Sequence, residues 1–212
     1  MPVLAVPVKR LERAKTRLAA LLSPTERRAL TLAMLEDVLD AGAAQRGWDL
    51  WVVSGDPAAL AAGAQRGARP FIDEAGSLLE ALRAVEAEAP TDDLAVLLAD
   101  LPLVDAGALA DALAVDAAVV AVRAASDGGT NLLVRRPAGA IPARFGRNSF
   151  AKHCWAAGRA GLPLKEAAAP ELAFDLDIPA DLERLLAAEG GGRARALCED
   201  LGVGERLRAG VS

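Results

Sequence analysis

The chain has 212 residues, of which 53% are apolar and 3% aromatic, and its 24 basic and 29 acidic side chains give a formal charge of −5. This hydrophobicity excludes an intrinsically disordered chain. The low aromatic content and the lack of a basic excess argue against a nucleic-acid partner, which needs cations for phosphates and rings for bases.

Short apolar runs alternate with helical patterns along the first part of the chain. The runs predict strands at Val3–Val8, Asp49–Ser54, Arg69–Ile72, Leu94–Ala99 and Ala117–Val122. A capping box at Ser23–Glu26 opens a helix that ends near Gly42, and further helices are predicted at Pro57–Ala64, Ser77–Ala89 and Ala106–Leu113. In the helix Ser77–Ala89 we expect Leu78, Leu79, Leu82 and Val85 to face the core. Continuous apolar strands that alternate with helices indicate a mostly parallel sheet covered on both faces, a three-layer Rossmann-like α/β fold.

The rhythm of the pattern changes after residue 123. Strands are predicted at Asn131–Arg135 and Leu172–Leu176, and helices at Ser149–Gly161, Pro179–Glu189 and, as one further helix, over 193–208. No linker divides the chain, so we expect one domain over residues 1–212. The N-terminus is apolar and then basic, the reverse of a secretory signal, and no apolar run approaches the about 20 residues that span a bilayer. We therefore expect a cytoplasmic protein without a membrane partner, whose Cys154 and Cys198 stay reduced.

Three aspartates stand where buried strands are predicted to end. Asp100 directly follows the apolar run Leu94–Ala99, and the carboxyl edge of an open α/β sheet is where ligands bind. Asp105 is the better cap for the next helix. Asp175 and Asp177 lie two apart in a predicted strand, so they share a face, and their like charges need a cation such as Mg²⁺. Asp177 could instead cap the helix that starts at Pro179, which would leave Asp175 unexplained.

Cationic and small polar residues supply the remaining site candidates. The segment after the first strand carries Lys9, Arg10, Arg13, Lys15 and Arg17, which fits either an anion-binding loop or a solvated basic loop. Paired glycines precede Thr130, and Phe145-Gly146-Arg147-Asn148-Ser149 opens a helix with Ser149 as its expected N-cap; either motif could bind an anion or be an ordinary turn. We expect His153 to be a buried, hydrogen-bonded histidine.

Taken in order, these segments resemble the guanylyltransferases of deazaflavin (coenzyme F-420) biosynthesis, which have a nucleotidyltransferase fold similar to the molybdenum-cofactor guanylyltransferases. The landmarks are VPVKRLERAKTRL, LAMLEDVL, LADLPL, GGTNLL, FGRNSFAKH and FDLDIPADL, spread over nearly the whole chain. Thr16 stands where similar enzymes usually have Ser. Glu80 stands where they tend to have Asn, which puts a hydrogen bond to the nucleotide in doubt.

The resemblance implies a reaction and assigns roles. The family condenses GTP with phosphoenolpyruvate, 2-phospho-L-lactate or 3-phosphoglycerate and releases pyrophosphate. The resemblance implies that Asp100, Asp175 and Asp177 bind Mg²⁺ and that Thr130, Gly146 and Ser149 bind the acid. Lys9, Lys15 and Arg17 would face the GTP phosphates. The Ala-, Arg- and Gly-rich composition suggests a GC-rich bacterial source. Because bacterial members of the family are more often associated with phosphoenolpyruvate, the resemblance favours this acid as acceptor.

The chemistry agrees with the residue inventory. A phosphate monoester is largely dianionic at neutral pH and attacks without a general base, which suits a chain with one histidine. Two other readings stay open: another nucleotidyltransferase of the same fold, or a binding module whose acidic cluster is structural. The sequence leaves the oligomeric state open, a homodimer included.

Overall fold

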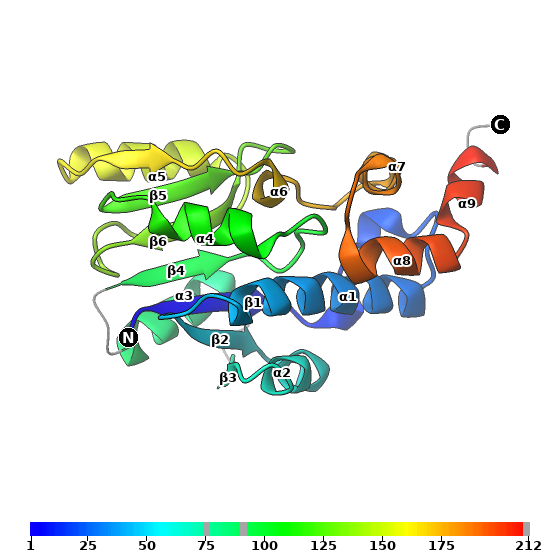
Figure 1. The fold of residues 1–212 in the computed structure, drawn as a ribbon, viewed down its shortest axis with the longest axis horizontal. Helices are drawn as coiled ribbons and strands as arrows, with labels where there is room; N and C mark the ends of the chain where they lie inside the picture. Colours follow the sequence, from blue (N-terminus) through cyan, green and yellow to red (C-terminus); the bar gives the residue numbers. More distant parts are fainter. Residues whose placement is uncertain (74–76, 90–92, 210–212) are drawn as a thin grey trace.

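The computed structural model describes residues 1–73, 77–89 and 93–209, and the side chain of Arg13 also lies outside the described part. Its centre is a seven-stranded sheet in the order β3-β2-β1-β4-β6-β5-β7, counted over these residues (Figure 1). The strands are β1 Val3–Val8, β2 Asp49–Ser54, β3 Arg69–Ile72, β4 Leu94–Leu97, β5 Val119–Arg123, β6 Thr130–Arg135 and β7 Leu164–Glu166. Every neighbouring pair is parallel except the two pairs that β6 makes. The sequence-based prediction of a mostly parallel sheet is confirmed.

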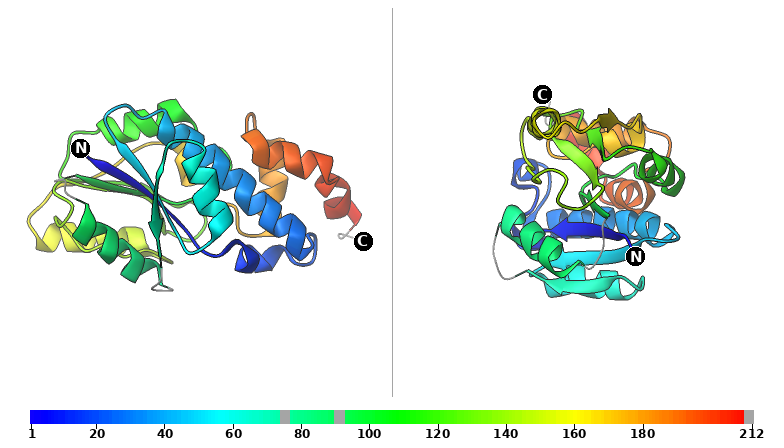
Figure 2. Two further views of the ribbon diagram at one scale, coloured as in Figure 1. Left: turned by 90° about the horizontal axis from the view of Figure 1, so that it is seen from below. Right: turned by 90° about the vertical axis from the view of Figure 1, so that its left-hand side faces the viewer.

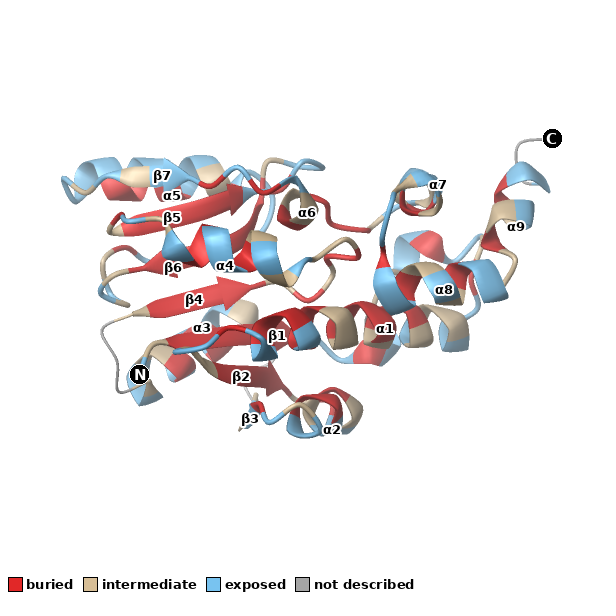
Figure 3. Cartoon of the chain, viewed as in Figure 1, coloured by how far each residue is buried: buried red, intermediate tan, exposed pale blue. Residues whose placement is uncertain are grey.

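Helices cover both faces of this sheet, as the end-on view in Figure 2 shows. Helices α1 (Pro24–Ala43), α2 (Pro57–Ala64) and α4 (Ala106–Ala114) share one apolar core with the sheet, and α3 (Leu78–Glu88) and α5 (Ser149–Arg159) pack on the opposite face. The strands are buried over almost their whole length in the middle of the sheet (Figure 3). This burial on two sides explains their continuous apolar sequence.

A second core extends the molecule beyond the sheet. It joins the first half of α1 to the short helix η2 (Thr16–Leu18) and to α7 (Pro179–Ala187), α8 (Gly192–Asp200) and α9 (Val203–Ala209). In Figure 1 these helices lie to the right of the sheet, next to the end toward which β4 points. Loops at the carboxyl edge therefore lie between two packed bodies of the fold.

Most predicted elements are confirmed to within two residues, and three expectations are wrong. Residues Leu172–Leu176 form no strand: Pro170–Ala173 is the short helix α6, followed by an extended segment. The alternating apolar residues Leu172, Phe174 and Leu176 are buried in the two cores rather than paired in the sheet. The tail is two helices because Gly202, at φ +63°, ends the first. Leu79 is 40% exposed and does not face the core.

None of the helices in the described part of the chain combines the length and the hydropathy that crossing a bilayer requires.

Candidate active site at the carboxyl edge of the sheet

The parallel order of the strands gathers the predicted site residues at one edge. Lys9 follows the last residue of β1, and Asp100 lies three residues beyond the end of β4. Because β6 runs in the opposite direction, its first residue, Thr130, stands at this same edge. Residues far apart in sequence therefore meet here for topological reasons.

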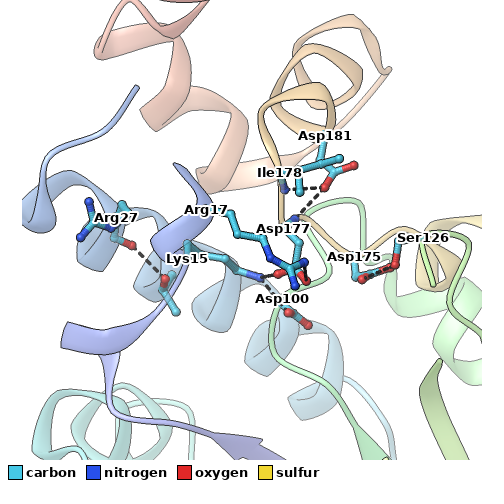
Figure 4. A network of polar contacts seen from close by, with 10 residues as sticks. Lys15, Arg17, Arg27, Asp100, Ser126, Asp175, Asp177, Ile178 and Asp181 are labelled. Atoms are coloured by element: carbon cyan, nitrogen blue, oxygen red, sulfur yellow. Dashed lines mark hydrogen bonds and ion pairs between the residues drawn. The ribbon is translucent and has the colours of Figure 1, made fainter. Parts of the chain in front are cut away.

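Lys15 lies between two of the three aspartates (Figure 4). Its Nζ is 2.8 Å from Asp100 Oδ2 and 2.8 Å from Asp177 Oδ1. The Lys15 side chain is 6% exposed, whereas Asp100 and Asp177 are 31% and 43% exposed. Burial lowers the pKa of Lys15, but the two carboxylates together raise it above its ordinary value. The ammonium therefore stays charged and neutralises part of the acidic cluster.

The backbone at Lys15 is left-handed, with φ 52° and ψ 40°, between helix η1 (Leu11–Arg13) and η2. A non-glycine residue in this region costs about 1–3 kcal/mol and persists only where the surrounding contacts fix it. The start of the segment is held by the buried Asp56 carboxylate, which accepts a hydrogen bond from Leu11 N at 3.0 Å. The turn aims Lys15 inward, whereas the neighbouring cations Lys9, Arg10 and Arg17 are exposed.

Asp175 makes a separate contact in the same cluster. Both of its carboxylate oxygens accept from Ser126 Oγ, at 2.9 and 2.7 Å. Burial, and also the charges of Asp100 and Asp177, raise the pKa of Asp175, although the Ser126 hydrogen bond opposes this. The expectation that strand alternation places Asp175 and Asp177 on one face is wrong, because neither residue is in a strand. Packing brings them together instead.

The three aspartates suit Mg²⁺ in their chemistry, because hard divalent cations prefer carboxylate oxygens. Burial and the charges of Asp100 and Asp177 raise the pKa of Asp175, and a cation bound among the three carboxylates would relieve this repulsion. Among the described residues, however, no three acidic, His or Cys side chains are already arranged around one metal position. The three carboxylates are thus chemically suited to Mg²⁺. In this structure, two of them, Asp100 and Asp177, are arranged around the Lys15 ammonium.

The start of α7 is capped by a residue that the sequence did not single out. The Asp181 carboxylate accepts hydrogen bonds from the backbone N–H groups of Asp177 and Ile178, at 2.7 and 2.8 Å. Asp177 itself is not the cap, so its side chain is available to Lys15 (Figure 4). By contrast, the expected Asp105 cap is confirmed, with bonds of 2.9 Å from Gly107 N and Ala108 N.

The other two predicted phosphate-facing cations are exposed at the rim. The Arg17 side chain is 72% exposed and lies 3.9 Å from Asp177 Oδ2. Lys9 is exposed at the end of β1. Arg17 therefore lies beside the aspartates, whereas for Lys9 the structure shows only a place at the same edge of the sheet.

Thr130, Ser149 and His153 form a hydrogen-bonded group on β6 and α5. Ser149 Oγ is 3.0 Å from Thr130 Oγ1, which lies 3.0 Å from His153 Nδ1. His153 is fully buried, as expected. The prediction that Ser149 caps α5 is wrong: Asn148, at φ 56°, precedes the helix and Ser149 is its first residue.

The two glycine-containing loops bind each other through the backbone. Between the loops, Phe150 N at the start of α5 donates to Gly128 O and Asn148 N to Asp127 O, each at 3.2 Å. Within the first loop, Gly129 N donates to the side chain of Asp127, to Oδ1, at 2.7 Å. These N–H groups are therefore not free to bind an anion, and they support the interpretation of the two motifs as ordinary turns. Gly146 is exposed, with φ +104° and no heavy atom within 4 Å of the place of a Cβ. Glu80 accepts from Ser77 Oγ at 2.7 Å at the start of α3.

Comparison with known proteins identifies relatives over nearly the whole chain. Residues 1–209 match the family model described as "Guanylyl transferase CofC like". A protein of Sphaerobacter thermophilus named phosphoenolpyruvate guanylyltransferase is 43% identical over 190 residues, which is 86% of this chain and 91% of that protein. A protein of Phenylobacterium zucineum named 3-phospho-D-glycerate guanylyltransferase is 36% identical over 207 residues, 89% of this chain and 91% of its own length.

Solved structures share the fold at much lower identity. A candidate nucleotide-diphospho-sugar transferase from Desulfovibrio desulfuricans G20 superposes with a TM-score of 0.74 at 19% identity, covering 99% of this chain and 98% of that one. A nucleotidyl transferase from Methanothermobacter gives a TM-score of 0.63 at 20% identity, covering 87% and 95%. The sheet and its helices are thus those of nucleotidyltransferases.

Proposed function

The chain belongs to the CofC-like family of guanylyl transferases, and we propose that it joins GTP to phosphoenolpyruvate and releases pyrophosphate. The product is enolpyruvoyl-2-diphospho-5'-guanosine, and the step serves coenzyme F-420 biosynthesis in the cytoplasm. The observation that carries the proposal is the 43% identity, over 91% of its length, to a protein named phosphoenolpyruvate guanylyltransferase. A Rubrobacter xylanophilus protein of the same name supports it at 42% identity.

The reaction joins two anions without a change in oxidation state. An oxygen of the acceptor phosphate forms a bond to the α-phosphorus of GTP, and the bond from that phosphorus to the β-phosphate oxygen breaks. The acceptor phosphate is largely dianionic at neutral pH, since its second pKa is about 6, so no protein group has to remove a proton. The task of the chain is to position the two anions and to neutralise their charge.

Asp100, Asp175 and Asp177 are the residues that we propose hold Mg²⁺. Bound there, the ion would neutralise phosphate charge and align the attacking and leaving oxygens. Lys15 keeps Asp100 and Asp177 in position and shielded from each other before nucleotide binds. We propose that Lys9, Lys15 and Arg17 stabilise the charge that develops on pyrophosphate.

Thr130, Gly146 and Ser149 are the residues that we propose bind the acceptor acid. Gly146 is exposed with open space at the position of a Cβ, and its carbonyl accepts from Ser149 N, which belongs to the buried hydroxyl pair Thr130–Ser149. An acid bound there stands at the same edge of the sheet as the aspartates. This arrangement supports transfer between a nucleotide over β1 and β4 and an acceptor at the start of β6.

A product assay tests the proposal directly. The purified protein is incubated with GTP, MgCl₂ and one of three acids, and pyrophosphate and the nucleotide product are measured by mass spectrometry. We expect turnover with phosphoenolpyruvate at a higher kcat/KM than with 2-phospho-L-lactate or 3-phospho-D-glycerate. Absence of turnover with all three acids would refute the guanylyltransferase proposal, and a preference for another acid would refute the choice of acceptor.

The second candidate is 3-phospho-D-glycerate as acceptor, which the 36% identical Phenylobacterium protein favours. The same assay decides between them. Replacing GTP by ATP, CTP or UTP in a thermal-shift series tests the base, since a larger shift with another triphosphate would contradict a guanylyl donor. No shift with any Mg²⁺-nucleotide would support a plain binding module instead.

A further inference from the structure

His153 is a buried polar residue to which the proposed reaction assigns no task. It is the only histidine of the chain and is 0% exposed on α5. Its Nε2 accepts a hydrogen bond from Arg144 N at 2.9 Å, and its Nδ1 lies 3.0 Å from Thr130 Oγ1. The ring also meets Phe145 edge-on, with centroids 5.8 Å apart. Both ring nitrogens thus have a fixed partner.

These partners determine where the imidazole proton lies. A backbone N–H can only donate, so Nε2 must present its lone pair to Arg144. Burial, together with the nearby cations Arg135, Arg144 and Lys152, lowers the pKa of His153 to about 4, so the ring is neutral at neutral pH. A neutral ring carries one proton, and here it must be on Nδ1. His153 therefore donates to Thr130 Oγ1.

Counting the protons of the neighbouring hydroxyls leads to the next step. Thr130 and Ser149 have two hydroxyl protons, and the 3.0 Å contact between their oxygens uses one. Neither proton can point at His153, because Nδ1 already supplies the proton of that bond. Whichever hydroxyl donates to the other, one proton is left over. Thr130 is 2% and Ser149 0% exposed, so this proton belongs to a side chain that is almost cut off from bulk water.

The hydroxyl pair lies close to an exposed turn. Thr130 is the first residue of β6, at the carboxyl edge of the sheet, and the backbone of Ser149 binds that of the exposed Gly146. Two of the backbone donors at the start of α5 are already used, since Ser149 N binds Gly146 O at 3.0 Å and Phe150 N binds Gly128 O at 3.2 Å. The remaining hydroxyl proton is then a donor for an incoming anionic oxygen.

We propose that His153 is a positioning residue for the acceptor acid. By donating from Nδ1 to Thr130, it leaves the Thr130–Ser149 pair with one proton to donate, and this favours an anionic oxygen of the phospho-acid as the partner. A carboxylate or phosphate oxygen accepts this proton, whereas a ligand group that can only donate leaves it unpaired. The inference rests on the proposed acceptor site and adds a directed hydrogen-bond chain from Arg144 N–H through His153.

Nitrogen-15 NMR of the native protein tests the proton position without any turnover. With ¹⁵N-histidine labelling, the single imidazole gives two ring-nitrogen signals, which distinguish the tautomers and the cation. We expect a neutral ring protonated on Nδ1 at pH 7, and a shift of this signal when phosphoenolpyruvate is added but not when GTP is added alone. An Nε2-protonated or cationic ring, or no response to any of the three acids, would overturn the proposal.

Kinetics of two matched variants test the effect on binding. In His153→Gln the carbonyl can replace Nε2 as the acceptor for Arg144, but the donor to Thr130 is lost. We expect KM for the acid to rise about ten-fold or more, with KM for GTP unchanged, because a hydrogen bond to a charged group is misdirected. In His153→Asn the amide nitrogen can take the place of Nδ1, and we expect KM for the acid within about three-fold of native.

The controls separate a positioning role from a merely structural one. Trp155→Phe, on the same helix with a 65% exposed side chain, should leave both KM values unchanged. If Gln and Asn variants that melt as folded proteins change both KM values alike, or change neither, His153 has only a structural role. If the native protein turns over none of the acids, the proposed function fails, and the NMR result still decides the proton position and the acid response.

Discussion

Replacing Lys15 by Met removes the one buried cation that the structure places between Asp100 and Asp177. Met preserves most of the volume of the apolar stem, so the change removes charge and hydrogen bonds rather than leaving a cavity. The variant isolates what the ammonium contributes. The matched control is Lys165→Met on β7, where an exposed lysine makes one 3.0 Å bond to Asp116 O.

The contacts of Lys15 set the expected size of the effect. Removing one partner of a fully buried ion pair costs about 3–5 kcal/mol, whereas an exposed pair contributes about 0–1 kcal/mol. Lys15 is 6% exposed, but its partners are 31% and 43% exposed and regain water when it is removed. We therefore expect a loss of about 1–3 kcal/mol in the free energy of unfolding. For a chain of this length this lowers Tm by roughly 2–12 °C.

Thermal unfolding with and without MgCl₂ measures both stability and the proposed metal site. Without Mg²⁺ the Lys15→Met variant should melt lower than native and lower than the control, whose change should stay within about 0.5 kcal/mol. With Mg²⁺ its Tm should rise more than that of native, because two carboxylates no longer have an ammonium as competitor. Its kcat in the guanylyl-transfer assay should fall about 10²-fold or more, since a donor to the leaving group is gone.

Two results would refute this reasoning. A Lys15→Met protein as stable as the Lys165→Met control would show that the buried contacts contribute nothing measurable. A Tm rise with Mg²⁺ no larger than that of native would show that Asp100 and Asp177 do not bind the ion in competition with Lys15.

Three further predictions concern other parts of the site and fold. Asp175→Asn keeps an acceptor for Ser126 but removes a carboxylate whose pKa is raised by burial and by the other aspartates. The Tm of this variant without metal should therefore equal or exceed that of native, while its kcat falls about 10²-fold, and a near-native kcat would contradict a metal role. Gly146→Ala should cost about 1–3 kcal/mol because φ is +104°, whereas Gly158→Ala in helix α5 should be neutral or stabilising; equal melting temperatures would exclude backbone strain at Gly146. Arg206 and the Ser23 cap lower the pKa of Glu26 to about 2, so its stabilisation is complete above its ordinary value of 4.5 and is lost as the pH falls toward 2. In urea titrations, Glu26→Gln should therefore be less stable than native at pH 6 and approach it toward pH 2, and a pH-independent gap would exclude this linkage.

Local patterns in the sequence were enough to predict most elements of the fold. The capping box Ser23–Glu26 is formed, with Ser23 N donating to Glu26 Oε2 at 2.7 Å and Glu26 N to Ser23 Oγ at 3.3 Å. Strands such as Asp49–Ser54 were predicted to the residue, because a strand buried on both faces must be apolar throughout. The alternation at Leu172–Leu176 misled for a related reason. Burial between two layers selects the same apolar residues as a strand does, and a single sequence does not show whether a neighbouring strand is present.

The sequence by itself therefore determined the layers and the residue types at the sheet edge, because periodicity, caps and charge are local properties. Its motifs indicated the family by their resemblance to known members. Only the tertiary structure decided how these residues pair. The left-handed turn at Lys15 and the packing of the 174–177 segment place an ammonium between Asp100 and Asp177, and leave Asp175 to Ser126. The reversed direction of β6 brings Thr130 to His153. Such contacts join residues separated by tens of positions, and their partners depend on strand order and loop conformation, which no local pattern specifies.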